Sequence, residues 1–125
     1  MLIVDDDERF ARALEALLEA HGGFEVIGWW ASNGVEAVGL VSSRRPDVVT
    51  MDVRMPVLGG IEATRAICAA FPEIRVVALT GSTEPDDVED VRAAGAAAQV
   101  TKDRAADELV DTIQRLAVAE RSLRD

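Results

Sequence analysis

Five polar residues, spread over most of the chain, each follow a short apolar run. The runs at 2–4, 48–51, 76–79 and 97–101 lead, in that order, into Asp5-Asp6, Asp52, Thr80 and Lys102. If the runs are parallel strands, their carboxyl ends share one edge of a sheet, which is where open α/β sheets bind their ligands. Three carboxylates, a hydroxyl and an ammonium at one edge are suited to metal binding and phosphoryl transfer.

Asp52 is the candidate nucleophile of this set. A carboxylate at the end of a buried strand can attack a phosphoryl group and form an acyl phosphate. An isolated aspartate here would more commonly cap a loop, but Asp5 and Asp6 favour the chemical role. Adjacent carboxylates near a third one repel each other unless a cation or a proton intervenes, and Mg²⁺ suits such a site. The alternative for this acidic run is helix capping, which we expect of Asp7.

Thr80 and Lys102 would complete a phosphoryl-transfer site. Such reactions depend on positioning and on neutralising the charge of the phosphoryl oxygens, which a hydroxyl and an ammonium can both do. Taken alone, Thr80 would be a turn residue and Lys102 a surface lysine. Their placement at successive strand ends favours the functional interpretation of both.

Strand-like and helix-like stretches alternate along the chain and predict the scaffold for these residues. Expected strands cover 2–4, 24–30, 47–51, 74–79 and 97–100, and the expected helices cover 8–20, 34–45, 61–71, 85–94 and a last segment through Leu116. Uninterrupted apolar strands separated by helices predict a parallel sheet covered on both faces. The predicted fold class is therefore α/β, a doubly wound (βα)5 domain.

Length and composition restrict the function further. The 125 residues suit one domain with a hydrophobic core, and the formal net charge of −10 argues against direct binding to nucleic-acid phosphates. The sequence has one cysteine, no apolar stretch near the roughly 20 residues that span a bilayer, and no signal-peptide pattern. We therefore expect a cytoplasmic protein with no membrane contact.

The motifs together resemble the receiver domain of bacterial two-component response regulators over essentially the whole chain. The matching segments are Val4-Asp5-Asp6, Met51-Asp52-Val53-Arg54-Met55-Pro56, Leu79-Thr80-Gly81 and Thr101-Lys102, with Gly60 at the family's usual glycine. The resemblance implies a flavodoxin-like five-stranded sheet of order 2-1-3-4-5. It also implies that a sensor histidine kinase phosphorylates Asp52, whose phosphoryl oxygens Thr80 and Lys102 would contact.

The same resemblance implies a magnesium site. Asp6 and Asp52 would bind Mg²⁺ directly, Asp5 mostly through water, and Arg54 through its backbone carbonyl. The chemistry would be limited to Mg²⁺-dependent self-phosphotransfer and autodephosphorylation, so the domain would act as a switch and not as an enzyme.

The Lys102-Asp103 pair resembles the nitrate-response class of regulators, which carry a helix-turn-helix output domain. We expect a receiver domain over 1–120, with 121–125 as a tail or the start of a linker. The expected role is the N-terminal receiver of a transcriptional regulator, with a possible homodimer and with DNA binding left to an output domain outside this sequence. The alternative is a stand-alone or degenerate receiver that serves as a docking or dimerisation module.

Gln99 departs from the receiver pattern, which usually has Tyr or Phe three residues before the lysine. We expect phosphorylation to be retained, with the signal on the neighbouring face weakened or rerouted. This departure favours the docking module, whereas the complete acidic site favours the switch. A phosphatase of the haloacid-dehalogenase type would need a second aspartate where Arg54 stands, which disfavours that third interpretation.

Overall fold

The structure is a computed structural model that describes residues 1–23, 26, 33–55, 57–81 and 85–124. Its elements follow the chain in the order β1 (Leu2–Val4), α1 (Glu8–His21), α2 (Gly34–Arg44), β2 (Val48–Asp52), α3 (Gly60–Ala70), β3 (Arg75–Thr80), α4 (Pro85–Ala94), β4 (Ala98–Thr101), η1 (Lys102–Arg104) and α5 (Ala105–Arg124). Among these described helices, none is long and apolar enough to cross a membrane.

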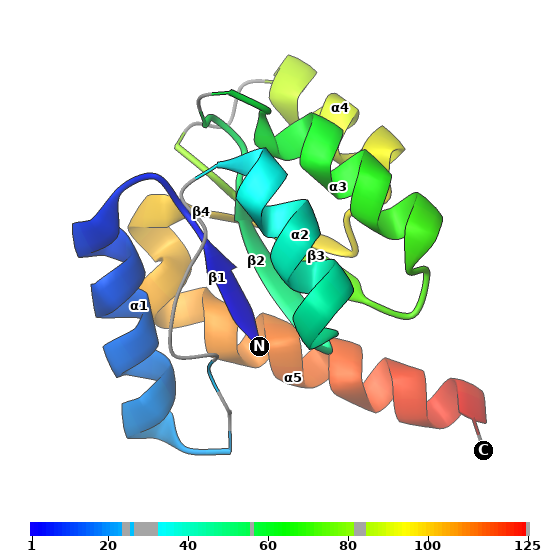
Figure 1. Ribbon diagram of the computed structural model, residues 1–125. Helices are drawn as coiled ribbons and strands as arrows, with labels where there is room; N and C mark the ends of the chain where they lie inside the picture. Colours follow the sequence, from blue (N-terminus) through cyan, green and yellow to red (C-terminus); the bar gives the residue numbers. More distant parts are fainter. Residues whose placement is uncertain (24–25, 27–32, 56, 82–84, 125) are drawn as a thin grey trace.

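Four parallel strands form the described sheet, in the order β1-β2-β3-β4 (Figure 1). β1 has its predicted bounds, and β2, β3 and β4 each begin and end one residue later than predicted. Asp52 and Thr80 are thus the last residues of their strands instead of the first residues after them. Apart from Val26, the strand expected over 24–30 lies outside the described residues, so the five-stranded order 2-1-3-4-5 stays a prediction.

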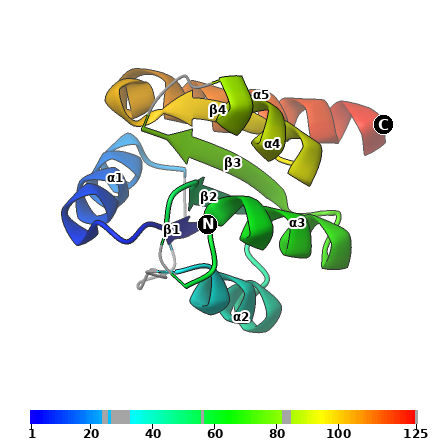
Figure 2. The same ribbon diagram turned by 90° about the horizontal axis from the view of Figure 1, so that it is seen from above.

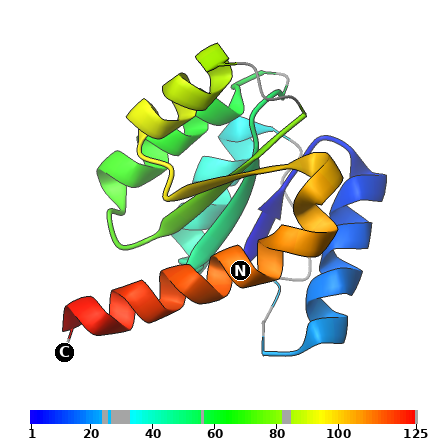
Figure 3. The same ribbon diagram turned by 180° about the vertical axis from the view of Figure 1, so that it is seen from behind.

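Helices cover both faces of the sheet, as the apolar strands predicted. α2, α3 and α4 lie on one face, and α1 and α5 lie on the other (Figure 2). Alternate strand residues supply the two cores: Val49, Met51 and Val76 pack with α2 and α3, while Ile3, Val77 and Leu79 pack with α1 and α5. The start of α5 lies beside α1 (Figure 3).

Side-chain caps fix where the first two helices begin. The Asp7 carboxylate accepts hydrogen bonds from the backbone N–H groups of Arg9 (3.0 Å) and Phe10 (3.3 Å), and Asn33 caps α2 through the N–H of Glu36 (3.0 Å). The predicted capping role of Asp7 is confirmed. Because Asp7 starts α1, Asp5 and Asp6 stay at the end of β1.

Val57, in the loop between β2 and α3, has a left-handed backbone with φ 68° and is 84% exposed. A β-branched side chain is costly in this region because its Cβ crowds the following carbonyl. We expect Val57→Gly to raise the free energy of unfolding by about 0.5–1 kcal/mol, after the greater entropy of an unfolded glycine is subtracted. Urea unfolding of Val57→Gly and of Val57→Ala measures this effect. An equal gain in both variants would contradict it, because alanine keeps the Cβ.

Candidate functional site

The ends of the strands surround a polar cavity of about 440 Å³. Its lining residues come from the carboxyl ends of the strands and the segments that follow them, and are Asp6, Asp7, Asp52, Val53, Arg54, Thr80, Gly81 and Lys102. Asp5 lies beneath the cavity, 1% exposed. The parallel sheet therefore brings together the five polar residues of the strand ends, although they are distant in the sequence.

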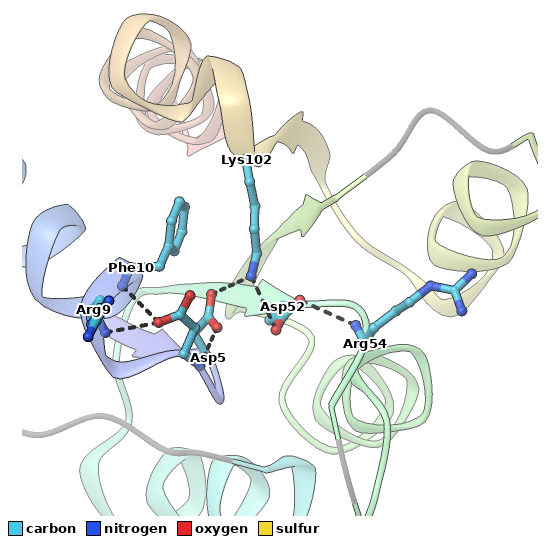
Figure 4. A network of polar contacts seen from close by, with 7 residues as sticks. Asp5, Arg9, Phe10, Asp52, Arg54 and Lys102 are labelled. Carbon is cyan, nitrogen blue, oxygen red and sulfur yellow. Dashed lines mark hydrogen bonds and ion pairs between the residues drawn. The ribbon is translucent and has the colours of Figure 1, made fainter.

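Three carboxylates form the acidic part of this site. One oxygen each of Asp5, Asp6 and Asp52 lies within 4.8 Å of the other two. Asp5 Oδ1 accepts a hydrogen bond from the backbone N–H of Asp7 at 2.8 Å, and Asp52 Oδ1 accepts one from the backbone N–H of Arg54 at 3.3 Å (Figure 4). Backbone donors thus orient the two buried carboxylates, while Asp6 is exposed to the cavity.

Lys102 lies between the two buried carboxylates. Its Nζ is 2.9 Å from Asp5 Oδ2 and 3.4 Å from Asp52 Oδ2 (Figure 4). Asp5 Oδ2 accepts no hydrogen bond of good geometry beyond this ion pair, so its bonding capacity is only partly used. A single ammonium also leaves the three carboxylates with excess negative charge.

Burial and charge change the protonation of the site. Burial, followed by the negative charge of Asp5, raises the pKa of Asp52 to about 7, although Lys102 opposes the change. Burial lowers the pKa of Lys102, but its hydrogen bond with Asp5 and the charge of Asp52 outweigh burial, so the pKa is raised above its ordinary value. Lys102 is therefore a permanent cation near neutral pH, whereas Asp52 titrates close to neutrality.

The raised pKa of Asp52 predicts a pH-dependent stability. Between about pH 4 and pH 7 the folded protein holds a proton on Asp52 that the unfolded chain has released. Relative to Asp52→Asn, the stabilising contribution is therefore fully present below about pH 4, declines as the pH rises, and is lost once the pH has passed about 7. We expect the parent protein to lose up to about 4 kcal/mol relative to the variant over this window. Urea unfolding of both proteins in EDTA, across that pH range, measures the difference, and parallel profiles would contradict it.

The residues present fit a hard divalent cation. The donors are carboxylate oxygens, one of them buried with spare bonding capacity, and they carry more negative charge than Lys102 neutralises. Mg²⁺ prefers such oxygen ligands and commonly keeps several waters, for which the open side of the cavity has room.

Gly60 holds the backbone of the site in place. A Cβ at this position would lie 2.0 Å from the carbonyl oxygen of Asp52, and the Gly60 N–H donates to the carbonyl of Val53 at 3.0 Å. The start of α3 therefore packs directly against the end of β2. The glycine in the receiver pattern has a steric reason here: no side chain fits between Asp52 and α3.

Two contacts at or near the site do not follow from the sequence pattern. The Phe10 ring lies over Lys102, with Nζ 4.8 Å from the ring centroid. The Gln99 side chain donates from Nε2 to the carbonyl of Val88 in α4 at 2.8 Å, so it ties β4 to α4 and is more than a polar strand end.

Comparison with known proteins gives consistent similarities. The profile of the response regulator receiver domain matches residues 1–114. The transcriptional regulatory protein LiaR of Bacillus subtilis is 38% identical over 123 residues, which are 98% of this chain and 58% of LiaR. The response regulator UvrY of Escherichia coli is 38% identical over 91% of this chain and 52% of its own length. The chain thus spans about half the length of these curated relatives.

Solved structures share the fold over almost the whole chain. A LuxR-family DNA-binding response regulator from Staphylococcus aureus superposes with a TM-score of 0.84 at 31% identity, over 91% of this chain and 95% of that one. The receiver domain of a NarL response regulator from Mycobacterium tuberculosis gives 0.84 at 27% identity, over 93% of each chain.

Proposed function

This chain belongs to the response regulator receiver domain family, and on that premise we propose that Asp52 accepts a phosphoryl group from a sensor histidine kinase in the presence of Mg²⁺. As a receiver, the domain is a phosphorylation switch of a two-component system and not a classical enzyme. The observation that carries the proposal is the placement of Asp52 and Lys102 in the lining of one open cavity, with buried Asp5 ion-paired to the same lysine.

The proposed step is an in-line transfer to the carboxylate. An Asp52 oxygen attacks phosphorus, the P–N bond of the phosphohistidine breaks, and the imidazole nitrogen leaves with the electron pair and takes up a proton. The product is a mixed anhydride on Asp52. The Lys102 ammonium is attracted to a phosphoryl oxygen, and the Thr80 hydroxyl donates a hydrogen bond to another.

A bound Mg²⁺ would supply positive charge that draws carboxylate and phosphoryl oxygens together. Asp6 and Asp52 would hold the ion directly, Asp5 mainly through water, and Arg54 through its backbone carbonyl. The clustered oxygens of the three aspartates support this ligand set.

The proposed output is a change in partner binding or homodimerisation. Because LiaR is named a transcriptional regulatory protein, we place this receiver at the N-terminus of a transcriptional regulator. DNA binding would belong to another part of that protein, since the formal net charge of −10 disfavours contact with the phosphate backbone of nucleic acids. Gln99 supports the second candidate, a docking or dimerisation module that does not need phosphorylation.

Phosphorylation by acetyl phosphate tests the proposal without a kinase. Intact-mass spectrometry should show one added phosphoryl group when Mg²⁺ is present and little or none in excess EDTA. Absence of the adduct under both conditions would overturn the switch and favour the docking module.

Gln99 provides a test of the output. A tyrosine ring at this position would replace the carboxamide that now bonds α4, and we expect Gln99→Tyr to strengthen phosphorylation-dependent dimerisation several-fold without changing the adduct yield. Light scattering with and without acetyl phosphate measures dimerisation, and Gln99→Leu controls for loss of the hydrogen bond alone. Unchanged dimerisation in Gln99→Tyr would count against a role for this position in the signal.

A further inference from the structure

Lys102 is the only lysine in the sequence. Phe10 is one of the residues that contact its ammonium. Two carboxylates bind the ammonium, and the Phe10 ring is a third neighbour, with its centroid 4.8 Å from Nζ. In Figure 4 the ring lies beside the lysine side chain and above Asp5, on the side of Lys102 that faces away from Asp52. The ring is therefore close enough to influence where the ammonium lies.

Lys102 borders two different environments. It lines the acidic cavity and also an apolar cavity of about 230 Å³ between α1 and α5, whose lining includes Phe10, Leu14, Leu17 and Ala105. Lys102 has a flexible four-carbon stem and is strongly hydrated at its end. Contact with the ring face limits how far the ammonium can turn away from the carboxylates, and the ring attracts the cation.

The backbone of α1 fixes the position of this ring. The N–H of Phe10 donates to Asp7, the helix cap, and the half-buried side chain packs against the core on the α1 and α5 face. The same acidic segment that supplies Asp5 and Asp6 thus also sets where the ring lies relative to Lys102.

We propose that Phe10 is a positioning residue. Its ring restricts the Lys102 ammonium to positions close to Asp52, the phosphoryl acceptor. The effect on phosphorylation rests on the proposed function, in which Lys102 contacts the phosphoryl group. The contact between Phe10 and Lys102 does not depend on that function, so the contact and its effect on phosphorylation can be tested separately.

Nuclear magnetic resonance of lysine-labelled protein tests the contact directly, because a single lysine gives a single side-chain signal. In the parent protein the Lys102 εCH₂ signal should be displaced by the ring current of Phe10. Phe10→Leu, which keeps an apolar side chain but lacks a ring, should move the signal toward that of an exposed lysine, and Phe10→Tyr should restore it.

The rate of phosphorylation by acetyl phosphate and Mg²⁺ tests the consequence. We expect it to fall about three- to tenfold in Phe10→Leu and to return to within about twofold of the parent in Phe10→Tyr. Leu17→Ala, which alters the same apolar cavity away from the ammonium, should leave both the rate and the signal close to the parent values.

The proposed phosphorylation of Asp52 and the positioning role of Phe10 would be contradicted by different results. A parent protein without adduct contradicts the proposed function, while the lysine signal still reports on Phe10. An unchanged Lys102 εCH₂ signal in Phe10→Leu overturns the positioning role. A signal that moves in Phe10→Leu while the phosphorylation rate stays at the parent value also overturns it. An equal loss of rate in Leu17→Ala also overturns it, because the effect would then come from general loosening of the α1–α5 contact.

Discussion

Asp52→Asn is expected to lose the phosphoryl adduct completely, because an amide has no anionic oxygen to attack phosphorus. The buried neighbouring carboxylate is not expected to replace it, because Asp5 is 1% exposed and ion-paired with Lys102. Intact-mass spectrometry after incubation with acetyl phosphate and Mg²⁺ measures the loss, and peptide mapping of the parent locates the group.

Asp47→Asn is the matched control, since Asp47 is exposed and lies just before the other end of β2. It removes the same charge from the opposite end of the same strand, away from the cavity, and its adduct should equal that of the parent. Circular dichroism shows whether Asp52→Asn keeps the fold. An equal adduct in Asp52→Asn would move the acceptor to another residue and would overturn the assignment of Asp52.

Gly60→Ala is expected to lower the free energy of unfolding by about 3 kcal/mol or more, the range of severe single substitutions. The new Cβ would lie 2.0 Å from the Asp52 carbonyl oxygen and 2.8 Å from the Val53 Cα, and neither backbone atom can move without shifting the acceptor. Phosphorylation should therefore fall even at temperatures where the variant is folded. Urea unfolding and the acetyl phosphate reaction measure the two effects.

Gly39→Ala controls for a change of glycine to alanine in a helix. Gly39 lies within α2 and no heavy atom would come within 4 Å of a Cβ there, so we expect a gain of about 0.5–1 kcal/mol from helix propensity. Equal changes in the free energy of unfolding for Gly60→Ala and Gly39→Ala would show that the close approach of Gly60 to Asp52 does not constrain the backbone.

The sequence predicted the parts of this site that depend on one strand and its end. Apolar runs define the strands, so the order of residues alone was enough to place Asp52, Thr80 and Lys102 at one edge of the sheet. The predicted ends of β2, β3 and β4 are each one residue early, because the polar Asp52, Thr80 and Thr101 continue the ladder as backbone although their side chains end the apolar pattern.

The contacts that could not be predicted depend on how separate elements pack. The amide of Gln99 bonds a carbonyl of α4, and the ring of Phe10 lies over Lys102; neither follows from local spacing. The positive φ of Val57 could not be predicted either, because valine rarely adopts a left-handed backbone. Each is set by tertiary structure that overrides local preference.

The ion pair between Lys102 and Asp5 has a consequence for how the domain folds. It joins residues that follow β1 and β4, the two outer strands of the described sheet, and these residues are far apart in the sequence. Such non-local contacts form only after a large loss of chain entropy. Helices and neighbouring strands can form earlier, but Lys102 can pair with both Asp5 and Asp52 only when β1, β2 and β4 are all in place. In a refolding experiment, competence for phosphorylation should therefore appear with the slowest phase, so that incompletely folded chains carry no signal.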